Sequence, residues 1–104
     1  MINMSVLYPR MAGAKFNGKY YVESHIPMLR EKLGAACKAI VIDRGVRGGA
    51  PNIPAPFLII ANLMFDSLES FQAVYRPNAQ AIMGDVVNFS NVQPIIQISE
   101  VSSA

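Results

Sequence analysis

The sequence has one cysteine, no tryptophan and no long hydrophobic run. A lone cysteine, Cys37, cannot close an internal disulfide, whereas secreted domains of this size usually depend on several. The longest apolar run, residues 57–61, is far shorter than the ~20 residues that span a bilayer. The first five residues lack the basic and apolar regions of a signal peptide. We therefore expect a cytoplasmic protein with no membrane partner.

Charged residues make up only 15% of the 104 residues, whereas hydrophobic residues make up 52%. An intrinsically disordered chain has the opposite composition, so the sequence predicts one folded domain over residues 1–104. The formal net charge is +2 and no run of five cations occurs, so the footprint of a nucleic-acid-binding protein is missing. With one histidine, one cysteine and no cluster of carboxylates, a dedicated transition-metal site is not expected.

Four segments have the short, alternating or β-branched pattern of strands. They are residues 2–8, 39–43, 57–65 and 92–101. The segment 57–65 is apolar at both its odd and its even positions, with Asn62 as the only polar member. Because successive side chains of a strand point to opposite faces, both faces of this strand must be covered.

Helices are predicted between these strands. The first spans about residues 18–33, with Asn17 as its N-cap, and Pro27 inside it is expected to bend or break the helix. The second spans about residues 68–75, after a capping box. Pro77 suits the first position of another short helix, which would end near residue 84.

The resulting order, β-α-β-β-α-β, predicts an α+β, ferredoxin-like fold with a four-stranded antiparallel sheet. Its helices cover one face of the sheet, and the other face would stay exposed in a monomer. About five large apolar side chains on that face would each contribute roughly 1.5–3 kcal/mol on burial, before the costs of association. We therefore predict a homodimer in which two sheets pack face to face.

His25 is the only side chain with an ordinary pKa near neutrality, and it lies four residues after Tyr21 on the same helix face. A lone histidine on an apolar helix face is more often a hydrogen-bonded core residue, and the alternative is a catalytic acid or base. Tyr20 and Tyr21 place two phenols on neighbouring faces, where they serve packing or direct a hydroxyl into a cavity. Cys37 has no partner at an informative spacing and is interpreted as a buried structural thiol.

Polar and apolar residues alternate in the segment 84–90, which includes Asp85, Asn88 and Phe89. Such residues form Asx turns and helix caps in many loops. A carboxylate can instead orient an imidazole. The sequence does not place Asp85 beside His25, so both interpretations stay open.

Several segments together resemble the EthD family, and the resemblance extends over essentially the whole chain. The segments are Val6-Leu7-Tyr8-Pro9-Arg10, Phe16-Asn17-Gly18-Lys19-Tyr20-Tyr21, His25-Ile26-Pro27-Met28, Pro54-Ala55-Pro56-Phe57 and Gly84-Asp85-Val86-Val87-Asn88-Phe89-Ser90. The resemblance implies a dimeric α/β barrel of two ferredoxin-like subunits. Where the family usually has an acidic residue after the first phenylalanine, this chain has Asn17, which keeps a helix cap but loses a charge. Carried over residue by residue, the functional positions of the family fall on His25, Tyr20, Tyr21, Asp85 and Asn88.

The family is named for a protein of bacterial ethyl tert-butyl ether degradation, and similar barrels include cofactor-free monooxygenases, haem-degrading enzymes, muconolactone isomerases and polyketide cyclases. The resemblance thus implies an enzyme without a bound cofactor that acts on a small, apolar, oxygen-bearing metabolite, whether aromatic, polyketide-like or ether-derived. Isomerisation, cyclisation and monooxygenation all remain open, because fold analogy does not choose among chemistries.

In this hypothesis His25 moves a proton as general acid or base and the hydroxyl of Tyr21 holds a substrate oxygen. Substrate contacts are assigned to Tyr20, Asp85, Asn88 and Phe89. The alternative is a non-catalytic dimeric protein that binds a small ligand or assists an oxygenase pathway. A third hypothesis is haem binding, which a Soret band on adding haem would reveal.

Overall fold

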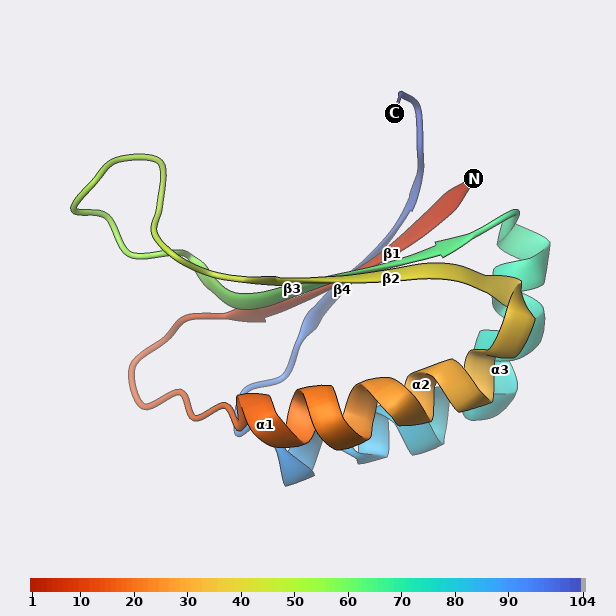
Figure 1. The fold of residues 1–104 in the computed structure, drawn as a ribbon, viewed down its shortest axis with the longest axis horizontal. Coiled ribbons are helices and arrows are strands. Elements are labelled where there is room, and N and C mark those ends of the chain that lie inside the picture. The colour runs from red at the N-terminus through yellow and green to blue at the C-terminus, as the bar shows by residue number, and fades with distance from the viewer. Residues whose placement is uncertain (104) are drawn as a thin grey trace.

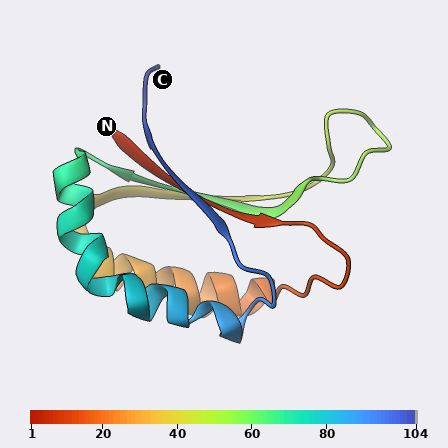
Figure 2. The same cartoon turned by 180° about the vertical axis from the view of Figure 1, so that it is seen from behind.

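A computed structural model describes residues 1–103 as a sheet with helices on one face. The four strands are antiparallel and lie in the order β2-β3-β1-β4. The helices lie below the sheet in Figure 1, and the view from behind in Figure 2 shows none on the opposite face. The strands are β1 (Ile2–Pro9), β2 (Cys37–Arg44), β3 (Phe57–Phe65) and β4 (Ile95–Glu100). This is the ferredoxin-like α+β fold that the sequence predicts.

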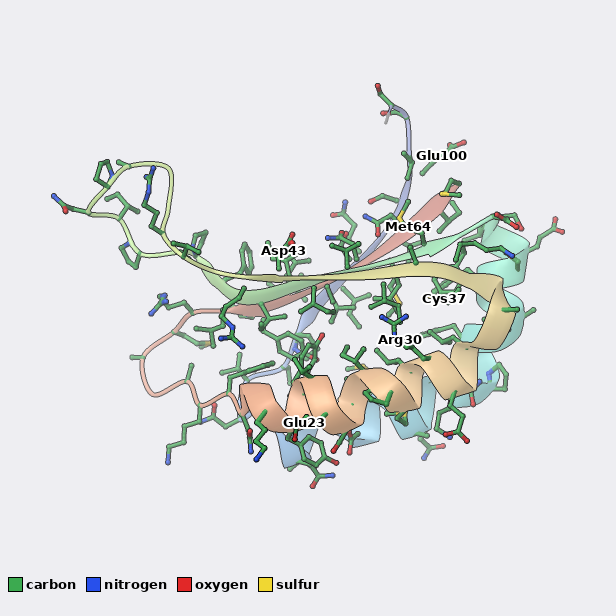
Figure 3. All side chains as sticks on the ribbon, viewed as in Figure 1. Glu23, Arg30, Cys37, Asp43, Met64 and Glu100 are labelled. Atoms are coloured by element: carbon green, nitrogen blue, oxygen red, sulfur yellow. The ribbon has the colours of Figure 1, made fainter. Side chains whose placement is uncertain are left out.

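The central strands β1 and β3 give the sheet an inner face, toward the helices, and an outer face. Alternate residues of β3 are buried on the inner face, each no more than 4% exposed: Ile59, Ala61, Leu63 and Phe65. Side chains fill the space between the sheet and the helices, whereas Asp43 and Met64 project from the outer face (Figure 3). The core therefore occupies only one side of the sheet.

The first helical segment is continuous but changes its hydrogen-bond pattern twice. It consists of α1 (Gly18–Tyr20), the π-helical turn η1 (Tyr21–His25) and α2 (Ile26–Leu33). The side chain of Asn17 caps its start, accepting a bond of 3.0 Å from the Tyr20 amide. The predicted distortion at Pro27 takes the form of the π turn just before it, where the Ile26 amide donates to the Tyr21 carbonyl. A short 3-10 turn, η2 (Gly34–Ala36), follows Leu33.

The second helical segment corrects the prediction of two short helices, because α3 (Leu68–Gly84) runs through Pro77 without a break. Pro77 lacks an amide hydrogen, and Figure 2 shows that the helix changes direction along its length. Both halves bury an apolar residue in one core, Phe71 before the proline and Ile82 after it, and this packing offsets the cost of the proline. A 3-10 turn, η3 (Val86–Asn88), follows the helix.

Three strands also differ in length from the prediction, and β1 continues one residue beyond 2–8, to Pro9. β2 is longer than 39–43 at both ends, and β4 is shorter than 92–101. The start of the predicted last strand forms a turn instead, because the Ser90 hydroxyl accepts from the Val92 amide at 2.9 Å and donates to the Val92 carbonyl at 2.8 Å. Cys37, predicted to be buried, is only half-buried at the start of β2. No helix within residues 1–103 is long and apolar enough to cross a membrane.

Candidate functional site

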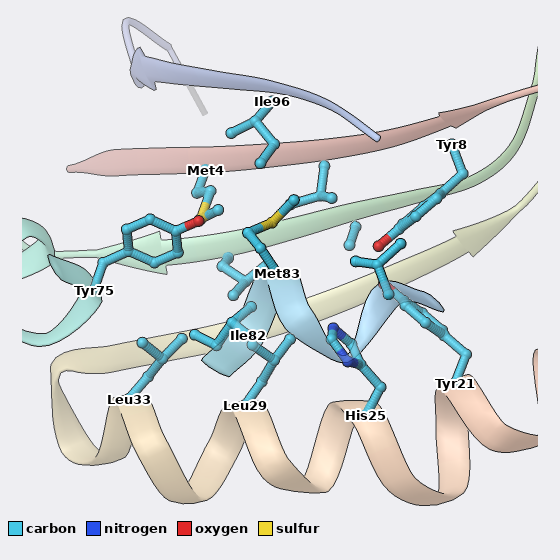
Figure 4. A pocket seen from close by; sticks show the side chains of 14 residues that line it. Met4, Tyr8, Tyr21, His25, Leu29, Leu33, Tyr75, Ile82, Met83 and Ile96 are labelled. Atoms are coloured by element: carbon cyan, nitrogen blue, oxygen red, sulfur yellow. The ribbon is translucent and has the colours of Figure 1, made fainter. Parts of the chain in front are cut away.

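A cavity lies between the inner face of the sheet and the helices (Figure 4). Its free volume is about 20 Å³, which is room for about one water molecule. Most of its wall is aliphatic or thioether side chain: Met4, Val6, Leu29, Leu33, Ala61, Leu63, Ile82, Met83, Val86 and Ile96. The remaining lining residues are His25, Tyr8, Tyr21 and Tyr75. An organic ligand therefore enters only if these walls move apart, and the flexible side chains of Met4 and Met83 suit such a movement.

His25 is the one histidine in this wall, and it is only 3% exposed. The π turn places its imidazole parallel to the ring of Tyr21, with centroids 5.4 Å apart and planes inclined by 19°. The ring of Phe89 packs against it on another side at 4.6 Å. Packing against the rings of Tyr21 and Phe89 fixes the orientation of the imidazole.

The imidazole Nδ1 lies 2.9 Å from Asp85 Oδ2, which answers the question that the sequence left open. Asp85 follows the last residue of α3 and contacts His25, which lies 60 residues earlier in the chain. Its other oxygen, Oδ1, accepts from the Tyr20 hydroxyl at 2.8 Å and from the Asn88 side-chain amide at 2.9 Å. The carboxylate therefore has three donors around it and a fixed position.

These contacts determine the charges of the pair. Burial acts to raise the pKa of Asp85, but the hydrogen bonds from Asn88, His25 and Tyr20 outweigh it and keep this pKa below its ordinary value. Burial lowers the pKa of His25, although the hydrogen bond and charge of Asp85 oppose this change. At neutral pH the site thus holds an ionised Asp85 and a neutral His25.

A neutral imidazole beside an ionised carboxylate has only one favourable tautomer. Asp85 accepts only, so Nδ1 of His25 carries the hydrogen and Nε2 keeps a free lone pair. No hydrogen bond reaches Nε2 from residues 1–103, and Figure 4 shows the ring directed into the cavity. The arrangement can accept a proton from a molecule in the cavity, and Asp85 stabilises the imidazolium that results.

Three tyrosines supply the polar groups of the cavity besides His25. Burial raises the pKa of Tyr8 and of Tyr21 well above the ordinary value, so both hydroxyls stay protonated and can donate hydrogen bonds. Tyr75, from α3, lines the cavity far from His25 in Figure 4, and burial raises its pKa as well. Tyr8 and Tyr75 were not predicted as site residues. The alternation of β1, which places Tyr8 on the face of Met4, was the signal that could have found Tyr8.

The six predicted site residues occupy two layers of the structure. His25 and Tyr21 line the cavity. Tyr20, Asp85, Asn88 and Phe89 do not line it and lie behind His25, where they contact the imidazole or the carboxylate. Among the described residues, histidine, cysteine and acidic side chains form no group of three or more that could hold a metal ion.

Comparisons with known proteins agree with this architecture. The sequence profile of the EthD domain matches residues 9–93. A search of curated proteins gave no match. The crystal structure of an EthD-like protein from Ralstonia eutropha JMP134 is similar at 35% identity, with a TM-score of 0.91 over 98% of this chain and 92% of the other.

A second crystal structure shares the fold alone. It is an ethyl tert-butyl ether degradation (EthD) family protein from Bacillus halodurans C-125, with 20% identity and a TM-score of 0.74 over 96% of this chain and 97% of the other. The profile match and the first crystal structure together go beyond the fold. They show that this chain belongs to the EthD family.

Proposed function

We propose that this protein is an enzyme that binds a small, largely apolar, oxygen-bearing molecule in the cavity and transfers a proton with His25, without a bound cofactor. The reaction class is proton abstraction next to a carbonyl or an activated aromatic carbon. Isomerisation, cyclisation and oxygenation of the resulting carbanion all begin with this step. The proposed compartment is the cytoplasm, which suits a chain with a single unpaired thiol.

The observation that carries the proposal is the 2.9 Å contact between His25 Nδ1 and Asp85 Oδ2. It leaves Nε2 as a base directed into an apolar cavity, where few other polar groups compete for a proton. The carboxylate itself is held by Tyr20 and Asn88, so the imidazole does not need to reorganise when it becomes charged. A core histidine with only a packing role needs no such ordered chain of donors.

A tyrosine hydroxyl is proposed to hold the substrate oxygen. Tyr21 stacks on His25, and its hydroxyl forms no hydrogen bond with another group of residues 1–103. Tyr8 is in edge-to-face contact with Tyr21, with centroids 5.8 Å apart. Because burial keeps both hydroxyls neutral, either can donate to the oxygen on which negative charge develops after proton abstraction.

The experiment measures exchange of the α-protons of small aryl ketones, such as propiophenone, for deuterium in D₂O by proton NMR. We expect the protein to accelerate the exchange, and His25→Gln to reduce the acceleration by about 10²–10⁴-fold. Val22→Gln, which changes an exposed residue of the same π turn, serves as the control. If a ketone binds in the cavity but its exchange rate is the same with the unchanged protein as with His25→Gln, the result would favour the alternative, a binding or accessory protein.

We further propose that the protein is a homodimer whose outer sheet faces meet. The outer face contains exposed or half-exposed apolar residues from all four strands: Leu7, Val41, Leu58, Ile60, Met64 and Ile95. At its centre Asn62 accepts hydrogen bonds from Asn3 at 3.0 Å and from Ser5 at 3.2 Å. Most of these polar groups are already paired within the chain, so their burial in an interface would cost little, whereas Asn3 Oδ1 is buried without a partner among residues 1–103.

A further inference from the structure

A groove of about 440 Å³ opens at the end of the molecule where β1 and β2 end and α1 begins. Three basic side chains line it, from three separate segments of the chain: Arg10, Lys19 and Arg44. Among residues 1–103, no acidic side chain lines it. In a chain with only nine cations, this is a local concentration of positive charge that the formal net charge of +2 conceals.

Within the described part of the chain, these cations have no carboxylate partner. Over residues 1–103 the ion pairs within 4.0 Å are His25 with Asp85 and Lys38 with Asp66, and neither involves the groove. Mutual repulsion of three unpaired cations is unfavourable, and an anion bound between them removes it. The groove is therefore electrostatically complementary to a negatively charged group.

One of the three side chains, Arg10, is already held in place by a hydrogen bond. The Nε of Arg10 donates to the Ala55 carbonyl at 2.8 Å, which fixes the guanidinium plane and leaves its terminal nitrogens free. Arg44 extends from the end of β2 over the helix start, with Nη2 lying 3.5 Å from the point where a Cβ of Gly18 would be. Guanidinium groups suit bidentate binding of a carboxylate or a phosphate, and that of Arg10 is already oriented for it.

The rest of the groove is apolar and adjoins the cavity. Phe16, Leu58 and Ile59 complete its lining. The ring of Phe16 also packs on Tyr8 and on Tyr21, at 5.1 Å from each, and these two line the cavity. One aromatic ring thus separates the basic groove from the cavity.

We propose that this groove is a binding site for a small organic anion, whose carboxylate or phosphate contacts Arg10, Lys19 and Arg44 and whose apolar part packs on Phe16. The site is distinct from the His25 cavity and does not depend on the proton-transfer proposal. Its ligand class is an aryl carboxylate or aryl phosphate.

The test is an NMR titration of the ¹⁵N-labelled protein with benzoate, phenyl phosphate and inorganic phosphate at constant ionic strength. We expect saturable shifts of the Gly18, Lys19 and Gly45 amides with both organic anions. Inorganic phosphate should bind at least about fivefold more weakly, because it has no apolar part to pack on Phe16. Equal binding of inorganic phosphate and phenyl phosphate would contradict an organic ligand.

Variants locate the site. Arg44→Gln should weaken benzoate binding about tenfold, whereas Arg76→Gln, which removes an exposed arginine of α3, should leave it unchanged. His25→Gln should also leave binding in the groove unchanged, which separates this proposal from the proposed function. Absence of saturable shifts, or equal weakening by Arg44→Gln and Arg76→Gln, would overturn the proposal.

Discussion

The two faces of β3 differ although the strand is apolar on both. On the inner face Leu63 and Phe65 are at most 1% exposed, covered by helices of the same chain. On the outer face their neighbours Asn62 and Met64 stay partly exposed, and Val41, opposite Asn62 in β2, is 53% exposed. One face is thus complete within the chain and the other is not. A strand pattern alone does not tell which kind of partner covers an apolar face.

The two faces also differ in what their polar groups do. On the inner side, the polar groups of His25 and Asp85 form a directed pair that ends at a cavity. On the outer side, Asn3, Ser5 and Asn62 bond only to one another. The inner polar groups leave one acceptor free for chemistry, whereas the outer ones bond to one another and leave the buried Asn3 Oδ1 without a partner among residues 1–103. The following predictions test this contrast.

Truncation of the inner face should have the largest effect on stability. Phe65 is 0% exposed and packs edge to face on Phe71 at 5.0 Å, so Phe65→Ala should cost about 3–5 kcal/mol in the free energy of unfolding. Urea denaturation measures this cost, and the outer neighbour Met64→Ala is the control. The cost of Met64→Ala should be smaller in dilute solution and should grow with protein concentration. A cost for Phe65→Ala no larger than that of Met64→Ala in dilute solution would contradict the assignment of the faces.

A charge on the outer face should dissociate the proposed dimer without unfolding the chain. Ile60→Lys places a cation in the interface, where the cost of removing it from water exceeds its attraction to Asp43 on the neighbouring strand, and we expect the dissociation constant to rise by about 100-fold or more. Sedimentation velocity measures it, with Val22→Lys on the exposed side of η1 as the control. If Ile60→Lys sediments like the unchanged protein, the outer face is not the interface.

Loss of the Asp85 carboxylate should reduce the rate at which ketone α-protons exchange for deuterium by about 10- to 100-fold. Asp85→Asn can donate its amide hydrogens to Nδ1, which favours the tautomer with hydrogen on Nε2 and removes the free base from the cavity. Asp43→Asn, an exposed change on the outer face, should leave the exchange rate as it is. Equal rates for both variants would show that Asp85 does not position the histidine.

The smallest expected effect is on how the free energy of unfolding depends on pH. Burial lowers the pKa of folded His25 below its ordinary value of 6.5, so the unfolded chain binds a proton first as the pH falls. The stability from neutral His25 is therefore complete above pH 6.5 and is lost as the pH falls through the folded pKa. His25→Gln should flatten the stability curve between pH 6.5 and 5, measured by urea denaturation at each pH. A curve for His25→Gln that is as steep as for the unchanged chain would contradict the lowered pKa.

The sequence predicted the faces of the sheet and the type of fold because strand alternation and helix caps act locally. Asn17 caps the first helix as predicted, and the apolar pattern of β3 located the core. The predicted break at Pro77 was wrong. The loss of one amide hydrogen is a local penalty that the sequence shows, whereas the packing of Phe71 and Ile82 that offsets it depends on the tertiary structure.

The candidate site was predicted as a set of residues but not as an arrangement. His25 and Tyr21 share a helix face through their spacing, and the structure stacks them. The contact between His25 and Asp85 depends on where α3 ends after its bend, which no local pattern determines. The same limit concealed the basic groove, because Arg10 and Arg44 come together only when β1 and β2 end at one edge of the fold.

The imidazole of His25 provides the most direct measurement, because the chain has one histidine and its signals need no separate assignment. A long-range ¹H–¹⁵N NMR spectrum at neutral pH reports which ring nitrogen carries the hydrogen, and a titration reports the pKa. The hydrogen should lie on Nδ1, facing Asp85, with a pKa below 6.5. A hydrogen on Nε2 would mean that no free base is directed into the cavity, and a pKa above 6.5 would contradict the effect of burial on His25.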